Sequence, residues 1–234
     1  MSSYKGHSLF ALVLALLYSF NPLIIALAIV SANMPDFDHK VRKENVYKII
    51  ILGLLIFISL YILKLPYLIG VIIVFLGVIF YFSEHRSFTH SIPGIIVLTA
   101  TVSLILIWAY DIVINVTVLP NNYLMAILIA LLSFLFLNKK LLPIFLPIFF
   151  VSVAFLQTFE LTYYEIIFSA FLGLFSHSVL DAFTPAGVKL FTPFSQKDYH
   201  KNFAIASIFI LIVLALIWRS PELFSLFKYF ISLS

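Results

Sequence analysis

Long apolar runs, separated by short polar loops, make up most of the chain. A helix that spans a bilayer needs about 20 mostly apolar residues, with a range of roughly 17–25. The runs are apolar throughout and do not alternate with polar residues, so they predict helices and not the strands of a membrane barrel. The pattern therefore predicts an all-α, polytopic transmembrane helical bundle with about seven spanning helices, at residues 47–63, 66–83, 92–110, 123–137, 141–157, 165–180 and 203–218.

The first apolar run, residues 8–30, admits two interpretations. Its length suits a single span, which would bring the total to eight. However, Asn21-Pro22 lies near its middle, and a proline there disfavours a continuous helix through the preceding residue. The alternative is a re-entrant hairpin of two half-length helices, each roughly 18 Å long, at about 8–19 and 22–33. A hairpin would place His7 on the same face as the loop that follows residue 33, whereas a single span would place it on the opposite face.

Composition supports one integral membrane domain over residues 1–234. Hydrophobic residues make up 63% of the chain and charged residues only 10%, whereas a soluble domain carries about 25% charged residues. There is no cysteine, which excludes disulfides and thiolate ligands, so that any metal must be held by nitrogen and oxygen. The net charge of +4 is spread thinly over several loops and gives no indication of nucleic-acid binding.

Basic residues gather on the face that holds the loops 34–46, 84–91, 138–140 and 181–202. Ten lie on or beside that face, namely Lys40, Arg42, Lys43, Lys48, Arg86, Lys139, Lys140, Lys189, Lys197 and Lys201. The other face has three, Lys64, Arg219 and Lys228. The positive-inside rule then predicts a multi-pass protein of the cell membrane whose first face is cytoplasmic.

Two pairs of ligand-type residues belong to this cytoplasmic face. His177 and Asp181 are four residues apart at the end of a predicted helix, so both project from one helical face and suit a metal or an orienting pair. Asp36 and Asp38 are two residues apart, and carboxylates that close repel unless a cation lies between them. The structural alternatives are a helix-end histidine that caps carbonyls and an aspartate that caps the next helix.

A third group occupies the loop at 84–91. His85 and His90 can bind a divalent metal as neutral imidazoles. Arg86, Thr89 and Ser91 can hold a phosphate by charge and hydroxyl donors. The alternative is ordinary loop polarity, with Arg86 merely following the charge rule. The case is strengthened because three independent motifs meet on one face of the membrane.

The remaining histidines differ in what they predict. His7 is near the terminus, where a solvated side chain is the usual case, and joins the ligand set only if the hairpin is correct. His39 and His200 are interpreted as residues of the membrane interface.

The order of these motifs resembles the YdjM-like family of membrane-bound metal-dependent hydrolases, described as LexA-regulated in some bacteria. The residues that carry the resemblance are His7, Pro35-Asp36-x-Asp38, His85-Arg86-x-x-Thr89-His90-Ser91, His177-x-x-x-Asp181, and the stretch Thr184-Pro185-x-Gly187 with Thr192-Pro193-Phe194. In that family the early histidine is part of the pattern, which favours the hairpin. The resemblance implies a divalent metal and hydrolysis. Ser87 is a mild departure, since a smaller residue is commoner after the arginine.

These observations lead to the hypothesis of a metal-dependent hydrolase with one or two divalent ions, zinc or manganese being expected. The candidate metal ligands are His7, Asp36, Asp38, His85, His90, His177 and Asp181. Asp38 is the candidate general base, and Arg86 with Thr89 would bind developing negative charge. The expected partners are membrane lipids and a small-molecule or lipid substrate, with a phosphoester of a phospholipid or isoprenoid as the analogy.

Two competing functions use the same residues. A metal-ion or proton transporter would place them on a path through the bilayer, although transporter sites usually lie near the midplane on broken helices. A non-catalytic scaffold or lipid-binding protein would tolerate alanine at these positions without loss of activity.

Overall fold

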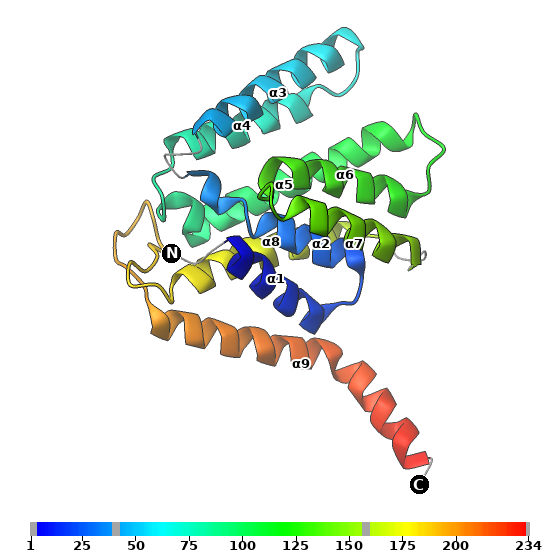
Figure 1. The fold of residues 1–234 in the computed structure, drawn as a ribbon, viewed down its shortest axis with the longest axis vertical. Coiled ribbons are helices and arrows are strands. Elements are labelled where there is room, and N and C mark those ends of the chain that lie inside the picture. The colour runs from blue at the N-terminus through cyan, green and yellow to red at the C-terminus, as the bar shows by residue number, and fades with distance from the viewer. Residues whose placement is uncertain (1–3, 39–42, 156–159, 233–234) are drawn as a thin grey trace.

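The computed structural model describes residues 4–38, 43–155 and 160–232, and its secondary structure is almost entirely helical (Figure 1). Within these ranges lie nine α-helices: α1 Tyr4–Tyr18, α2 Pro22–Ser31, α3 Lys43–Ile62, α4 Leu68–Phe82, α5 Ile92–Ile114, α6 Asn121–Phe136, α7 Leu142–Phe155, α8 Tyr163–Asp181 and α9 Lys201–Ser232. Each of the seven predicted segments corresponds to one helix, from α3 to α9. The predicted last residues of the fifth, 156–157, lie outside the described residues. The all-α prediction is therefore confirmed.

Four helices of the described ranges are long and apolar enough to cross a membrane, at Glu44–Ile62, Ile92–Ile114, Tyr163–Asp181 and Lys201–Pro221. The apolar helices α4, α6 and α7 are shorter, with 14 to 16 residues each, and at 1.5 Å per residue they fall short of a hydrocarbon core about 30 Å thick. The structure thus supports a helical membrane protein with four helices of spanning length. The predicted number of seven stays a prediction.

The first apolar run forms two helices, as the hairpin interpretation predicts. Asn21 caps α2, because its side chain accepts a hydrogen bond from the amide of Leu23, 3.0 Å away. Pro22 occupies the first turn of α2, where its missing N–H costs nothing. The Tyr18 hydroxyl at the end of α1 donates to the carbonyl of Leu211 in α9. The chain therefore reverses direction after α1. As a result, the segment that follows α2 lies at the same end of the molecule as His7.

Helix α8 is the centre of the molecule and packs against α1, α2, α5 and α9. It approaches α2 closely at Gly173, where an added Cβ would lie 2.2 Å from the carbonyl oxygen of Ala28. Small residues at such a crossing let two helix backbones touch. About half of the apolar span of α8 is buried. This contact brings the end of α2 beside the last turns of α8.

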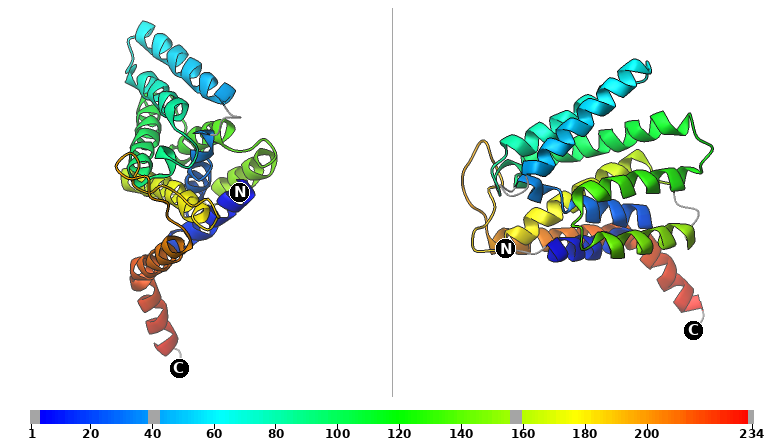
Figure 2. Two further views of the ribbon diagram at one scale, coloured as in Figure 1. Left: turned by 90° about the vertical axis from the view of Figure 1, so that its left-hand side faces the viewer. Right: turned by 45° about the horizontal axis from the view of Figure 1, so that its top comes forward.

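Helices α3 and α4 form a hairpin that projects from one side of this body, and the end of α9 projects from the other (Figure 2). Gly70 brings α4 against α3, since a Cβ there would lie 2.4 Å from the backbone nitrogen of Phe57. The spans in α3 and α9 are largely exposed. Their outer faces carry apolar side chains such as Leu54, Ile58, Phe209 and Ile217. Exposed apolar faces of this kind suit contact with lipid.

The polar segments that the sequence places on one face also meet in three dimensions. The start of α1 and the connections after α2, α4 and α8 all lie on the left of Figure 1. The connections after α3 and α5 lie on the right. One end of the bundle therefore holds all four segments that carry candidate ligands.

Candidate metal centre

Four separate segments build one buried polar cluster at this end of the bundle. They are the first turn of α1, the 3-10 turn η1 (Pro35–Asp38), the loop that ends in the 3-10 turn η3 (Phe88–His90), and the last turn of α8. The cluster is enclosed, since His90 and His177 have no exposed surface and Asp181 is 2% exposed. All seven predicted ligands, His7, Asp36, Asp38, His85, His90, His177 and Asp181, belong to it. Burying so many ionisable groups is costly unless they are paired or bind a metal.

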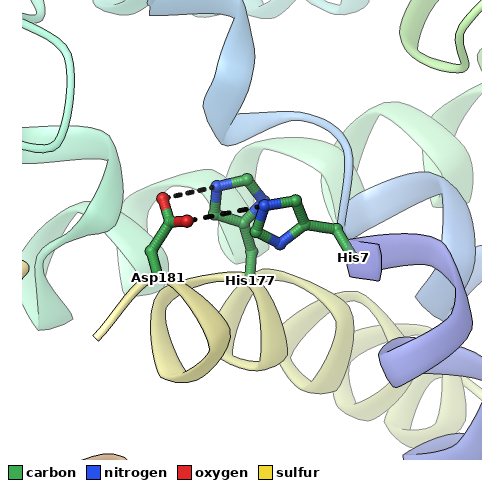
Figure 3. A group of neighbouring side chains, drawn as sticks. All are labelled: His7, His177 and Asp181. Carbon is green, nitrogen blue, oxygen red and sulfur yellow. Dashed lines mark ion pairs between the residues drawn. The ribbon is translucent and has the colours of Figure 1, made fainter. Parts of the chain in front are cut away.

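Helix α8 presents two ligands, and α1 adds a third (Figure 3). The helical spacing of four brings the His177 Nε2 atom within 3.5 Å of Asp181 Oδ2. The Nε2 atom of His7 lies 3.5 Å from the other oxygen, Asp181 Oδ1. The His7 and His177 rings stack with centroids 3.8 Å apart. His7, the weakest candidate in the sequence, is thus part of the cluster, and the turn between α1 and α2 is the reason.

His90 completes the innermost group. Its Nε2 atom is 3.0 Å from Nε2 of His177 and 3.4 Å from Oδ2 of Asp181. Ligand atoms at roughly 2.0–2.2 Å from one tetrahedral ion lie roughly 3.3–3.6 Å apart, so these three atoms are spaced much like ligands of a single metal.

Hydrogen bonds decide which nitrogen of each imidazole faces the cluster. The Nδ1 atom of His177 is 2.7 Å from the carbonyl oxygen of Ala32, which only accepts, so Nδ1 carries the proton. The Nδ1 atom of His90 is 3.0 Å from the Thr89 hydroxyl and 3.4 Å from Asp38. In their neutral forms both rings therefore turn lone pairs at Nε2 toward each other. At a separation of 3.0 Å these two nitrogens need a positive charge between them, which either a proton on one ring or a metal ion can supply.

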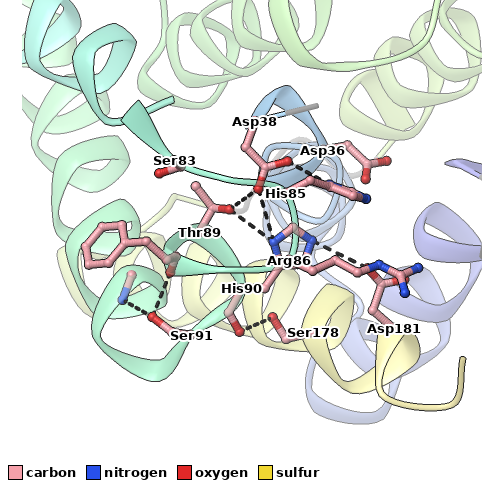
Figure 4. Close-up of polar contacts among 12 residues, drawn as sticks. Asp36, Asp38, Ser83, His85, Arg86, Thr89, His90, Ser91, Ser178 and Asp181 are labelled. Carbon is pink, nitrogen blue, oxygen red and sulfur yellow. Dashed lines mark hydrogen bonds and ion pairs between the residues drawn. The ribbon is translucent and has the colours of Figure 1, made fainter. Parts of the chain in front are cut away.

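Asp38 lies behind the histidines and orients them (Figure 4). Its Oδ1 atom is 2.8 Å from Nδ1 of His85, and its Oδ2 atom accepts a hydrogen bond from the Thr89 hydroxyl. Burial tends to raise the pKa of Asp38, but the hydrogen bonds from His85 and His90 outweigh it and lower the pKa to about 2. Both carboxylate oxygens are occupied in this way, which is the usual arrangement for a residue that holds metal-binding histidines in place.

The electrostatic field of the cluster favours positive charge near His90. Burial tends to lower the pKa of His90, but the carboxylates of Asp181 and Asp38 outweigh it and raise the pKa to about 9. A position that stabilises an extra positive charge inside a protein is suited to a metal cation.

A second group of three ligands adjoins the first. Asp36, His85 and His90 each offer a ligand atom, and these atoms lie within 4.8 Å of one another. Asp36 also connects the two groups, because its Oδ1 atom is 3.7 Å from Nε2 of His177. The side chains of Asp36 and His85 are 21% and 25% exposed, so this group forms the more exposed side of the cluster. A donor set of imidazoles and carboxylates is suited to a divalent metal ion.

Arg86 lies at the rim of the cluster. Its Nη1 atom donates to the Thr184 hydroxyl at 2.8 Å, and its Nε atom is 3.7 Å from Asp181 Oδ2. The backbone of Arg86 is left-handed, with φ at 62°, a conformation that a non-glycine residue adopts at some energetic cost and that clusters at functional sites. The loop thereby turns the guanidinium back toward the carboxylate. Thr184 belongs to the stretch that carries the family resemblance, although its pairing with Arg86 emerges only in three dimensions.

The loop at 84–91 is held against the start of α5. Ser91 caps α5, accepting from the Gly94 amide at 3.1 Å and donating to the Phe88 carbonyl at 2.7 Å. A Cβ at Gly94 would lie 1.7 Å from that same carbonyl, so only glycine allows the contact. Ser178 of α8 donates to the carbonyl of His90 at 3.0 Å. These bonds fix the position of His90 relative to α8.

Thr89 and Ser91, which the sequence predicts to bind phosphate, are buried in the structure and support neighbouring residues. Thr89 has no exposed surface, and its hydroxyl is hydrogen-bonded to Asp38. Ser91 is fully buried as the cap of α5. Neither hydroxyl is open to a substrate, because the loop folds them inward to support the histidines. Among the three residues of this loop that are predicted to bind phosphate, Arg86 is the one whose side chain lies at the rim of the cluster.

Two supporting residues have no signal in the sequence. Asn33 donates to the Ser8 hydroxyl at 2.9 Å and to the Ile29 carbonyl at 2.8 Å, which ties the start of α1 to the end of α2 beside His7.

Among the other histidines, His200 lies in the connection before α9, where its ring would meet a Cβ at Gly187. His39 lies outside the described residues.

Comparison with known proteins identifies the family. A family model described as YdjM inner membrane protein matches residues 1–233, nearly the whole chain. No significant match was found among curated proteins or solved structures. The match confirms the resemblance drawn from the order of the histidines and aspartates, and with the apolar helices it supports a location in the membrane. The chain belongs to the family of YdjM inner membrane proteins.

Proposed function

We propose that the chain is a membrane-bound hydrolase whose His/Asp cluster holds one or two divalent metal ions, zinc or manganese. The observation that carries the proposal is the meeting of Nε2 of His90 with Nε2 of His177 beside Asp181, each ring held through its other nitrogen. The further ligands divide between two groups, His7 with His177 and Asp181, and Asp36 and His85 with His90, which is the basis for proposing a second ion. When bound, a divalent ion supplies Lewis acidity and lowers the pKa of a coordinating water towards about 7, which makes a nucleophile available.

The side chains around the ions divide the remaining work. Asp38 is fully enclosed and hydrogen-bonded, so we assign it the orientation of His85 and His90 in place of the general-base role predicted from the sequence. Asp36 is the more exposed of the two carboxylates, so it is the one suited to accept a proton from a water molecule. Arg86 at the rim is suited to stabilise negative charge that develops on a substrate.

The substrate class follows from the position and charge of the site. An arginine beside the metal ligands favours a phosphoester, since its guanidinium matches phosphate oxygens. The cluster lies at the end of α8 and in two short 3-10 turns, an end of the bundle that we expect at the membrane surface, beside the lipid headgroups. A phosphoester of a lipid or isoprenoid is therefore the proposed substrate, and the face predicted to be cytoplasmic is the proposed site of reaction.

Transport of a metal ion or proton is the competing interpretation. Transporter sites usually lie near the bilayer midplane on interrupted helices. The cluster instead gathers where helices begin and end, on the same end of the bundle. This position favours hydrolysis at the interface.

Elemental analysis of the protein purified in detergent tests the metal centre first. The wild type is expected to carry stoichiometric zinc or manganese, and His90→Ala and His177→Ala are expected to lose it. His200→Ala is the matched control, because it removes a histidine outside the cluster. Folded variants that keep their metal, or a wild type that binds none after reconstitution, would overturn the metal centre.

The metal-loaded protein is then tested for hydrolysis of phospholipids and isoprenoid phosphates. Product that forms with the wild type and is absent with His177→Ala supports the hydrolase. Metal bound at the cluster together with ion uptake into vesicles, and no product, would favour the transporter.

A further inference from the structure

Beside the metal centre, helices α1, α2 and α7 enclose a groove of about 630 Å³. This volume is in the range of ligand-binding sites, roughly 300–1,000 Å³. Most of its lining is apolar and includes Leu12, Ile25, Ile29, Ile144, Ile148 and Phe149. The groove is therefore suited to a ligand whose main part is a hydrocarbon.

The groove has the length of one bilayer leaflet. Its α7 wall runs from Leu141 to Ser152, which at 1.5 Å per residue is roughly 16 Å along the helix. Half of a hydrocarbon core about 30 Å thick is a similar distance. An acyl chain that enters from the membrane surface can thus lie along α7 for most of its length.

One end of the groove is basic. Lys5 in the first turn of α1 and Lys140 just before α7 both line it, and both are exposed. Tyr4 and Ser8 add polar atoms at the same end of α1. Two ammonium groups above an apolar channel complement a ligand with a negative head and a hydrocarbon tail.

The basic end of the groove adjoins the metal centre. Ser8 lines the groove, and the preceding residue, His7, points to the other side of α1, where it meets Asp181 and His177. Asn33 hydrogen-bonds Ser8 and so connects the two sides. The start of α1 is thus the wall between a lipid-shaped groove and the metal ligands.

We propose that this groove binds one acyl chain of an anionic phospholipid, with its phosphate held by Lys5 and Lys140. Lipid binding is independent of catalysis. As the place where a substrate is positioned, the groove rests on the proposed hydrolase function, and the two are separated by the readouts below.

Native mass spectrometry of the full chain tests the groove, with phosphatidylglycerol and phosphatidylcholine of identical acyl chains as probes. The wild type is expected to retain phosphatidylglycerol preferentially. The double variant Lys5→Ala/Lys140→Ala is expected to bind it roughly thirtyfold more weakly. The two lysines are expected to contribute equally to the affinity for an anionic lipid, and their contributions multiply. Lys48→Ala is the matched control, because it removes an exposed lysine predicted to lie on the same face but outside the groove.

A second variant, Ile148→Trp, tests the apolar channel without changing charge. The larger side chain is expected to reduce the binding of both lipids by filling the groove. Equal binding of the two lipids by the wild type, or phosphatidylglycerol binding that survives both variants, would overturn the proposal. Metal content and product formation are measured on the same samples. If the protein retains lipid but binds no metal, the proposed groove is supported and the proposed hydrolase is overturned. If it binds metal and forms product but shows no selective lipid binding, the hydrolase is supported and the groove is overturned.

Discussion

At the scale of single residues, the geometry of the cluster depends on hydrogen-bonding groups that orient the candidate ligands. Ala32 contributes only a backbone carbonyl, yet that carbonyl determines which nitrogen of His177 faces the ligands. Asp38 does the same for His85 and His90. Residues that orient metal-binding histidines are expected to affect metal affinity nearly as strongly as the ligands themselves.

Replacing Asp38 with asparagine tests this role. Asp38→Asn keeps the shape of the side chain but removes the charge that His85, Thr89 and His90 surround. We expect the affinity for zinc to fall roughly 10–100-fold while the helical content is retained. A competition titration with a zinc chelator measures the change, and Asp111→Asn is the control on the other face of the bundle. Unchanged zinc affinity in Asp38→Asn would show that the carboxylate does not orient the histidines.

Arg86 allows a separate test of the proposed chemistry. Arg86→Lys keeps the positive charge but loses the planar guanidinium that binds Thr184 and faces Asp181. We expect kcat for a phosphoester substrate to fall by roughly 10²–10³, with bound metal unchanged, because charge stabilisation is lost while the ligands remain. Initial rates together with elemental analysis check both parts. A variant that loses its metal would instead place Arg86 among the groups that maintain the centre.

At the scale of elements, close helix contacts set the distances within the cluster. Gly173 lies one turn before His177 on α8, and Ala28 lies one turn before Ala32, the residue that caps the end of α2. The contact between Gly173 and the Ala28 carbonyl therefore sets the separation at which His177 meets its backbone acceptor one turn further on. The glycine contact is therefore a structural cause of the spacing between the candidate ligands.

Substituting glycines in two helix pairs separates this effect from general loss of packing. Gly173→Ala is expected to push α2 away from α8, with a loss of about 1–3 kcal/mol of stability and of bound metal. Gly70→Ala is the matched control, because its Cβ would meet α3 just as closely, at 2.4 Å, far along the chain from the ligands. It is expected to lower thermal stability and leave metal content unchanged. Metal loss in both variants, or in neither, would contradict a specific role for the α2–α8 contact.

At the scale of the whole molecule, the ends of the bundle differ in chemistry. One end carries the metal centre, the basic end of the lipid groove and most of the loop lysines. The positive-inside rule predicts that this end faces the cytoplasm. The substrate and the metal would then both be drawn from the cytoplasmic side.

Single cysteines test this orientation, and the absence of native cysteine makes the background clean. Lys64→Cys is expected to react with a membrane-impermeant maleimide in spheroplasts whose outer surface is exposed. Lys139→Cys is expected to react only after the membrane is made permeable, because its loop lies at the end with the metal centre. Labelling in the reverse order would invert the topology and place the proposed reaction on the outer side.

Much of the architecture could be predicted from the sequence, because the relevant signals are local. Apolar runs mark helices wherever they occur, since the backbone must satisfy its hydrogen bonds in lipid. The seven ligand candidates could also be found, because histidine and aspartate are rare in such segments and costly to place there. The order of these residues along the chain was enough to indicate the family.

The tertiary structure alone decided how these pieces act together. The turn at Asn21 and Pro22 brings His7 to Asp181, a contact that spans most of the chain. The inward folding of the 84–91 loop makes Thr89 a support for Asp38 and His90 and leaves Arg86 at the rim. The groove beside α1 exists only because α7 packs across from it. Such features depend on distances between remote segments, and those distances are set by helix packing, which no local pattern of residues encodes.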